Sequence, residues 1–151
     1  MFYLSLDPGE TIGWAKHDEV SGYASGQVAQ RDLWSFLETY RLARIGTVVP
    51  IGIVLIYEKF DRRTTAADLV AVECIGVIKE WQRQTRGARL EEQSASMAKF
   101  FWSDERLKSL ELYRVGKPHA NDALRHLCYY LHFSKRGPRW ALELPRTAEL
   151  P

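Results

Sequence analysis

Hydrophobic and polar residues alternate along the first part of the chain in a pattern that predicts short strands. Three β-type stretches lie at residues 2–7, 11–17 and 22–28, separated by an Asp-Pro-Gly turn and by the polar segment 18–22. Connections this short join antiparallel neighbours, so we expect a three-stranded meander. Residues 30–44 then carry apolar side chains at helical spacing and are predicted to form an amphipathic helix.

The middle of the chain combines a buried strand with a long helix. Residues 51–57 are apolar and rich in β-branched side chains, as in a central strand covered by helices on both faces. Thr64 and Thr65 offer an N-cap for a helix that ends near Gln84. A helix that is apolar on two faces needs a second partner besides its sheet, which favours a homodimer formed through residues 64–84. The apolar residues of this helix are Leu69, Val70, Val72, Cys74, Ile75, Val77, Ile78 and Trp81.

The last part of the chain is predicted to contain both helices and strands. A short strand is expected at residues 88–92 and a helical stretch opens at Ser94, while a return to the sheet at residues 110–114 would add a further strand. Pro118 suits the first turn of a helix, and residues 119–133 repeat apolar side chains at helical spacing, so this segment is predicted to be the last helix.

The length and composition fit one globular domain. The chain has 151 residues, of which 46% are hydrophobic and 26% are charged, enough for one core and too few for two. The element order predicts an α/β domain at residues 1–133, with helices on both faces of a mixed five-stranded sheet in which parallel strands extend the antiparallel meander. Residues 134–151, which contain Gly137 and three prolines, are predicted to be an irregular C-terminal tail.

Net charge alone does not identify a partner, because +2 is common among proteins that bind no nucleic acid. Basic residues nevertheless cluster. A solvated helix face is the alternative explanation for such clusters, and phosphate contacts with DNA are the functional one. The residues to which we assign these contacts are Arg62, Arg63, Lys79, Arg83, Arg86 and Arg89.

The cysteines and the start of the chain indicate a cytoplasmic protein. Cys74 and Cys128 lie in apolar helical patterns without metal-site spacing, so both are expected in the core. The first residues lack the pattern of a signal peptide, and no stretch approaches the roughly 18 apolar residues of a membrane span. We expect a reducing setting and no membrane partner, at the nucleoid or, for a viral protein, in the host cytoplasm.

Acidic side chains follow two of the predicted hydrophobic strands directly. Asp7 and Glu58 each stand where a side chain leaves the core and enters a cleft. His119 and Asp122 project from one face at the start of the last helix, and His126 follows four residues after Asp122. Each has a structural alternative, because strand-end acids occur in turns and an Asp in a first helical turn is stabilised by the helix dipole.

A divalent cation would give these residues a common role. Mg²⁺ prefers carboxylate oxygen and water, and carboxylates held together repel one another unless a cation neutralises them. We expect Asp7, Glu58, His119 and Asp122 to bind two Mg²⁺ ions about 4 Å apart, with Mn²⁺ as a substitute, and to hydrolyse phosphodiesters. His119 either binds the second metal or orients the attacking water.

Four stretches carry a resemblance to a known family: LSLDPGETIGW at residues 4–14, Tyr57-Glu58, Glu92-Gln93-Ser94 with the following Lys99, and HANDAL at residues 119–124. In order and spacing they resemble the RuvC Holliday junction resolvases of the RNase H-like superfamily. The likeness covers about residues 2–133. It implies an RNase H-like fold and a small divergent member of the family, with a cellular or a phage-type source left open.

The resemblance also implies a substrate. A RuvC-like homodimer would have two clefts, each making one of the paired nicks that resolve a four-way DNA junction. Phe60, shortly after Glu58, either enters the junction centre as an aromatic wedge or simply packs. Lys99 and Lys108 are the candidates for a phosphate-binding or catalytic lysine, and the sequence does not choose between them.

Three other functions stay open. A nuclease of the same fold acting on other branched or flap DNA, or on RNA, would use the same acids, because a metal cluster does not read branch structure. A non-catalytic nucleic-acid-binding module is disfavoured by the presence of all four polar residues. An ATPase related to actin or to sugar kinases would need two halves and a second phosphate loop, and 151 residues hold only one half.

Overall fold

The computed structural model describes residues 1–42, 52–59 and 66–134 of the chain. Its strands are β1 (Phe2–Asp7), β2 (Thr11–Asp18), β3 (Gly22–Ala29), β4 (Ile53–Glu58) and β5 (Ala88–Gln93). Its helices are α1 (Leu33–Leu42), α2 (Ala66–Gln84), α3 (Ala95–Phe101), α4 (Asp104–Ser109) and α5 (Pro118–Phe133), and a 3-10 turn, η1 (Gln30–Asp32), precedes α1.

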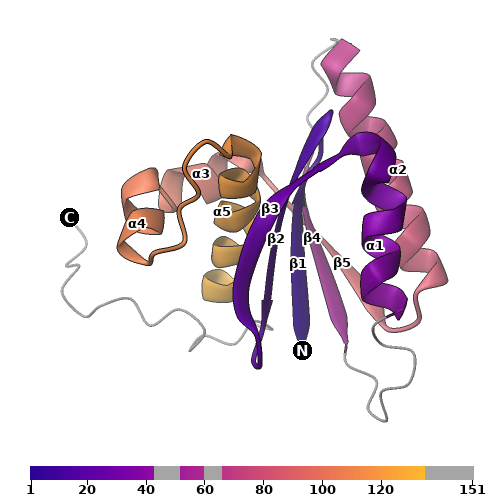
Figure 1. Cartoon of the computed structure of the whole chain (residues 1–151), viewed down its shortest axis with the longest axis horizontal. Helices are drawn as coiled ribbons and strands as arrows, with labels where there is room; N and C mark the ends of the chain where they lie inside the picture. The colour runs from indigo at the N-terminus through magenta and orange to yellow at the C-terminus, as the bar shows by residue number, and fades with distance from the viewer. Residues whose placement is uncertain (43–51, 60–65, 135–151) are drawn as a thin grey trace.

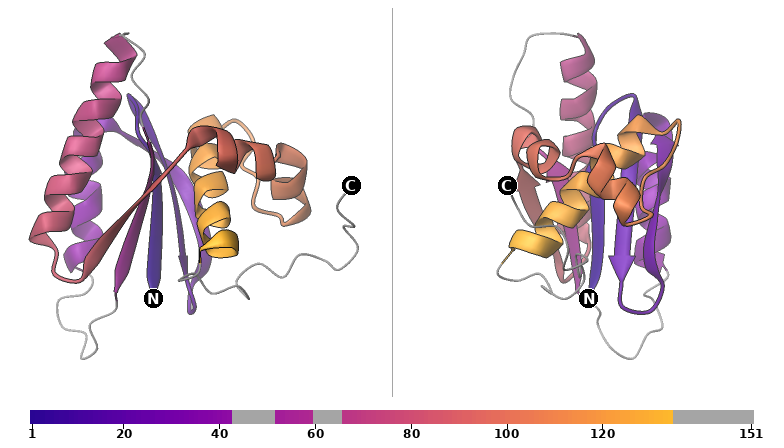
Figure 2. Two further views of the ribbon diagram at one scale, coloured as in Figure 1. Left: turned by 180° about the vertical axis from the view of Figure 1, so that it is seen from behind. Right: turned by 90° about the vertical axis from the view of Figure 1, so that its left-hand side faces the viewer.

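The strands form one mixed sheet in the order β3-β2-β1-β4-β5. The first three strands are the antiparallel meander, while β4 and β5 run parallel to β1. Helices α1 and α2 cover one face of the sheet, and α5, flanked by α3 and α4, covers the other (Figures 1 and 2). The predicted five-stranded sheet with helices on both faces is therefore confirmed.

The alternation of side chains along β1 and β4 divides the interior into two cores. Leu4 and Leu6 of β1 belong to the core under α1 and α2, whereas Tyr3 belongs to the core under α5. Because side chains alternate between the faces of a strand, Asp7 emerges on the α5 side with Tyr3. Glu58 of β4 follows Val54 and Ile56 on that same side by the same rule.

Helix α5 approaches the sheet most closely at Gly13 of β2. A Cβ atom added to Gly13 would lie 1.8 Å from the carbonyl oxygen of His119, so only glycine fits under the first turn of α5. Gly13 is also the residue of β2 that pairs with Asp7. The start of α5 therefore rests on the sheet directly beside the acidic end of β1.

Helix α2, which lies on the face of the sheet opposite α5, contacts the turn that follows β1. Cys74 is buried and its Sγ lies 3.6 Å from the carbonyl oxygen of Gly9 in the Asp-Pro-Gly turn. Cys74 and Cys128 are free and buried, which confirms the prediction that both belong to the core. Leu69 and Val72 of α2 are exposed.

The predicted strand at residues 110–114 is wrong. These residues form a turn in which Leu112 and Tyr113 donate backbone hydrogen bonds back to Leu107, at the end of α4, and Glu111 has a positive φ of 59°. Leu112 is buried in the core with α5, so its apolar side chain packs against helices and not into a strand. An apolar run of this length does not distinguish the two cases in a sequence.

Two smaller expectations also change. The helical stretch opening at Ser94 divides into α3 and α4, and the side chain of Ser103 caps α4 by accepting from the backbone N–H of Arg106. Because α5 begins at Pro118, Asp122 lies just past its first turn and not within it. Thr64, Thr65 and the predicted tail beyond Ser134 lie outside the described residues. None of the described helices combines the length and apolar character that crossing a membrane requires.

The close approach at Gly13 gives a stability prediction. Gly13→Ala should lower the free energy of unfolding by about 2 kcal/mol or more, because the added methyl group meets backbone atoms of α5 that cannot move without shifting the helix. The matched control is Gly76→Ala in α2, where an added Cβ meets nothing within 4 Å and should stabilise the fold by about 0.5–1 kcal/mol. Denaturant unfolding of both variants is the measurement, and similar shifts in the two would contradict the packing role of Gly13.

Candidate functional site

Asp7 and His119 meet at the carboxyl end of β1. The Nδ1 atom of His119 lies 3.0 Å from Oδ2 of Asp7, across 112 residues of sequence. The Asp7 side chain is 12% exposed and that of His119 is 45% exposed. The contact therefore joins a buried carboxylate to an imidazole that remains open to solvent.

Glu58 is held by a second histidine of α5. The Nε2 atom of His126 lies 3.1 Å from Oε2 of Glu58, and its Nδ1 lies 3.1 Å from Oε1 of Gln93. Glu58 and Gln93 end the parallel strands β4 and β5 and are paired in register. His126 is completely buried, so both of its ring nitrogens are engaged within the protein.

Asp122 is paired with two basic side chains. Its Oδ2 lies 3.1 Å from Nζ of Lys99 on α3, and its Oδ1 accepts a hydrogen bond from Arg125. The same guanidinium binds Asp104 at the start of α4 and donates from Nε to the carbonyl oxygen of Trp102. Arg125 therefore ties Asp122 to the segment that joins α3 and α4.

The three carboxylates share one electrostatic environment. Burial raises the pKa of Asp7 to about 6, the hydrogen bond to His119 opposes that rise, and the negative charges of Asp122 and Glu58 add to it. The charges of Asp122 and Glu58 are close enough to affect the pKa of Asp7. This shows that the ends of β1 and β4 and the start of α5 converge. The sequence-predicted residues Asp7, Glu58, His119 and Asp122 thus gather at one end of the sheet.

Lys99 is the cation that faces this group. Burial lowers the pKa of Lys99, but the ion pair with Asp122, together with the charges of Glu58 and Asp7, holds that pKa above its usual value. For Glu58, burial raises the pKa, and the hydrogen bond and charge of His126 with the charge of Lys99 bring it below its usual value. The charge of Lys99 therefore interacts with all three acids.

Each acid is engaged by a basic side chain, and this determines what the arrangement can bind. Within residues 1–42, 52–59 and 66–134, no group of three or more His, Cys, Asp or Glu side chains is placed to hold a metal ion. Both oxygens of Asp122 are occupied by Lys99 and Arg125. A cation could join the carboxylates only after some of these side chains move aside.

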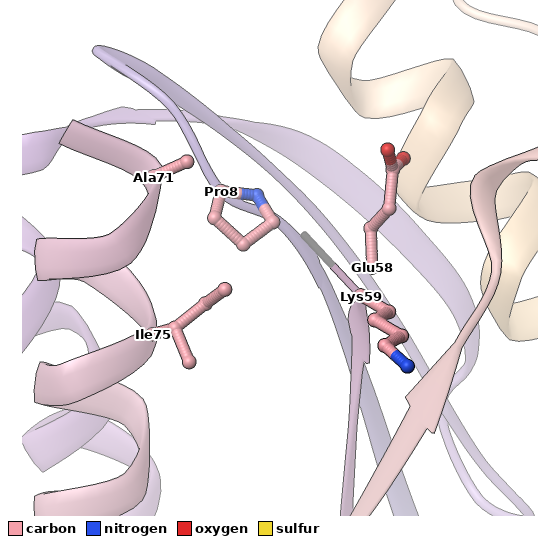
Figure 3. Close-up of a pocket in the computed structure, with 5 residues that line it drawn as sticks. All are labelled: Pro8, Glu58, Lys59, Ala71 and Ile75. Carbon is pink, nitrogen blue, oxygen red and sulfur yellow. The ribbon is translucent and has the colours of Figure 1, made fainter. Parts of the chain in front are cut away.

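A small pocket lies next to the acids on the α2 side. It is lined by Pro8, Glu58, Lys59, Ala71 and Ile75, and Figure 3 shows the Glu58 carboxylate pointing away from Ala71 and Ile75. The pocket therefore adjoins the back of Glu58, while its carboxylate faces α5.

Three of the described basic residues predicted to contact DNA lie away from the acids. Arg83, Arg86 and Arg89 lie where α2 turns into β5, at the end of the sheet opposite Glu58, since β4 and β5 are parallel and Val54 pairs with Arg89. Lys79 lies 5.9 Å from the ring centroid of Tyr57, and Lys108 on α4 lies 4.8 Å from that of Tyr113. The remaining candidates, Phe60, Arg62 and Arg63, lie outside the described residues.

Sequence reasoning did not assign roles to three side chains of this site. His126 was noted only for its position on the helix and Gln93 only as part of a segment that resembles the family, and Arg125 was given no role. The available signal was a histidine and an arginine on the apolar face of α5, where polar side chains need partners. Which partners they have depends on the placement of α5 against β4, β5 and α3, which no local pattern encodes.

Comparison with known proteins identifies the fold. No protein-family model and no curated protein matches the sequence. Among solved structures, the chain is similar to Thermus thermophilus RuvC in complex with a Holliday junction substrate, at 15% identity and a TM-score of 0.58, over 89% of this chain and 96% of that one. A second Thermus thermophilus RuvC structure matches at 14% identity and a TM-score of 0.52, over 86% of this chain and 95% of that one. The chain therefore has a RuvC-like fold of the RNase H-like type.

The raised pKa of Asp7 predicts how its replacement affects stability. Between the usual aspartate pKa of ~3.9 and about 6 the folded protein binds a proton that the unfolded chain has lost, so stability falls as pH rises through this window. Above it, Asp7→Asn should raise the free energy of unfolding by about 1–3 kcal/mol in the presence of EDTA. Below it, the two proteins should be similar.

Denaturant unfolding at several pH values tests this expectation. Glu19→Gln, in the turn at the opposite end of the sheet, is the control, because its carboxylate is exposed and lies far from Asp7. If Asp7→Asn lowered stability above the window, the contact with His119 would outweigh the cost of burying the charge.

Proposed function

We propose that the chain is a metal-dependent nuclease that acts on branched DNA, with the four-way junction as its substrate. The observation that carries the proposal is the convergence of Asp7, Glu58 and Asp122 from β1, β4 and α5, where burial raises the pKa of Asp7 to about 6 and the charges of the other two acids add to that rise. The RuvC-like fold supports it, because one of the similar structures is RuvC bound to a Holliday junction substrate.

The residues present fit a divalent cation. Three carboxylates and an imidazole are donors that Mg²⁺ and Mn²⁺ accept, and a bound cation would offset both the burial of charge and the smaller repulsion that raise the pKa of Asp7. Asp7, Glu58 and Asp122 would hold the metal, and His119 would complete the set. Bound there, Mg²⁺ would supply an activated water and would neutralise the charge that develops on the phosphate.

The protein's own side chains would prepare this site in two ways. Lys99 already balances the charge of the acids and is 47% exposed, so its ammonium can also reach a phosphate at the edge of the site. His119 is half open to solvent and has its Nε2 directed away from Asp7, which suits a group that contacts water or a second cation. Both arrangements favour a phosphodiester substrate over a neutral one.

Dimerisation is part of the proposal. Leu69 and Val72 of α2 are 67% and 50% exposed, while Cys74, Ile78 and Trp81 of the same helix are buried against the sheet. An apolar stripe that remains outside the core is expected to pack against a second copy of the chain. Two copies would supply the two clefts that paired nicks require.

A substrate panel tests the proposed activity. Labelled four-way junctions, flaps, linear duplex and RNA–DNA hybrids are incubated with the protein in Mg²⁺, with EDTA as the control. Paired nicks in the junction alone support the proposal. Cleavage of flaps or of RNA would indicate a nuclease of the same fold with another substrate, and binding without cleavage in Mg²⁺ or Mn²⁺ would indicate a non-catalytic nucleic-acid-binding module.

Amide replacements test the catalytic acids. Asp7→Asn and Asp122→Asn should each reduce cleavage by at least ~100-fold, because each removes a metal ligand, and loss of a supporting group alone costs roughly 10- to 100-fold. Both should leave junction affinity, measured in Ca²⁺ or EDTA, nearly unchanged, since neither residue is a phosphate contact. Glu19→Gln should cleave like the unmodified protein, and robust cleavage by either aspartate variant would rule out this site.

A further inference from the structure

His126 is a polar residue at a buried position whose surroundings suit an apolar side chain. Its side chain is 0% exposed and lies on the face of α5 that buries Leu127 and Ala123. Burying an imidazole in such surroundings costs free energy unless its nitrogens are hydrogen-bonded. An aliphatic side chain would pack here without that cost, so the need for packing alone does not account for the histidine.

The partners of His126 lie at the ends of two strands. Glu58 and Gln93 are neighbours in register, and the backbone N–H of Lys59 donates to the carbonyl oxygen of Gln93, 2.6 Å away. His126 reaches both side chains, at 3.1 Å each, from the opposite layer. The imidazole therefore fixes the carboxylate of Glu58 relative to α5.

The carboxylate of Glu58 fixes the direction of that contact. An ionised carboxylate only accepts, so Nε2 carries the hydrogen that is donated to Oε2. The amide of Gln93 then either donates from its NH₂ group to an unprotonated Nδ1 or, where both ring nitrogens are protonated, accepts through its oxygen. Oε1 of Glu58 is the oxygen that His126 does not hold.

Helix α5 also carries Asp122, the third acid of the site. Asp122 precedes His126 by one helical turn and His119 precedes it by two, so the three side chains share one face. His119 contacts Asp7 and His126 contacts Glu58. The same helix therefore sets where Asp122, Asp7 and Glu58 stand relative to one another.

We propose that His126, with Gln93 behind it, is a positioning residue that orients the Glu58 carboxylate toward a divalent cation. The inference rests on the proposed function. Hydrogen bonds to ligating carboxylates are the arrangement by which proteins orient metal ligands, and losing one costs roughly 10- to 100-fold in metal affinity. A purely structural His126 would leave metal affinity unchanged in any variant that folds.

Direct binding of Mn²⁺, followed by electron paramagnetic resonance without DNA, is the test. His126→Leu should fold, as judged by circular dichroism and Tm, and bind Mn²⁺ roughly 10- to 100-fold more weakly. His126→Gln, whose amide can donate near the position of Nε2, should recover most of the affinity. The Mg²⁺ concentration for half-maximal cleavage should rise in His126→Leu, while junction affinity in EDTA stays constant.

Two further variants keep the result decisive. Gln93→Leu breaks the same chain of hydrogen bonds at its half-buried end, so it decides the matter if His126→Leu does not fold. It should also weaken Mn²⁺ binding. Cys128→Ala is the control, because it removes buried volume from α5 two residues away without touching Glu58. It should lower Tm and leave Mn²⁺ affinity unchanged.

The outcomes separate this proposal from the function on which it rests. If the unmodified protein binds Mn²⁺ and Gln93→Leu and any folded His126→Leu bind it equally well, only the role of His126 is overturned. If the unmodified protein binds no Mn²⁺ and cleaves no branched DNA, the proposed function fails and the role of His126 fails with it. Weaker binding in Cys128→Ala to the same degree would show that the effect is general loss of packing.

Discussion

The contact between α5 and the sheet at Gly13 is the constraint on which the candidate site depends. The carbonyl of His119 occupies the space where any residue other than glycine at position 13 would place its Cβ atom. With the helix this close, the imidazole of His119 reaches Asp7, and the turns that follow bring Asp122 and His126 to the ends of α3 and β4. A shift of α5 away from β2 would lengthen all of these contacts together, because a helix moves as a rigid element.

Asp7, placed in this way, is costly to the folded protein. Burial and mutual repulsion raise the pKa of Asp7, and the positive charges of Lys99 and Arg125 offset part of that cost by pairing with Asp122. Such a site stores repulsion that a cation of higher charge can relieve, which is a common reason for functional residues to reduce stability. The ion pairs of Asp122 with Lys99 and Arg125 occupy the oxygens that a cation would bind. They therefore supply positive charge at the same oxygens and compete with a cation for them.

The sequence predicted the parts of the site that follow from periodicity. Alternation along β1 and β4 puts Asp7 and Glu58 on one face, and parallel strands bring their ends together, so both acids could be found from strand patterns alone. The pairing of His126 with Glu58 and Gln93 depends on how α5 crosses two strands, and the turn at residues 110–114 depends on packing against α4 and α5. The basic residues show the same limit: Arg83, Arg86 and Arg89 are close in sequence, but they lie near the end of the sheet opposite Glu58.

The distance in sequence between the site residues links the chemistry to completion of the fold. Asp7 and His119 are 112 residues apart, and Glu58 and His126 are 68 apart, so neither contact exists until the sheet has formed and the last helix has docked on it. A ligand that binds only this assembled state stabilises it by mass action. Any cation held by these carboxylates would therefore favour the docked position of α5, and the glycine that permits close docking would contribute to cation affinity without touching the cation.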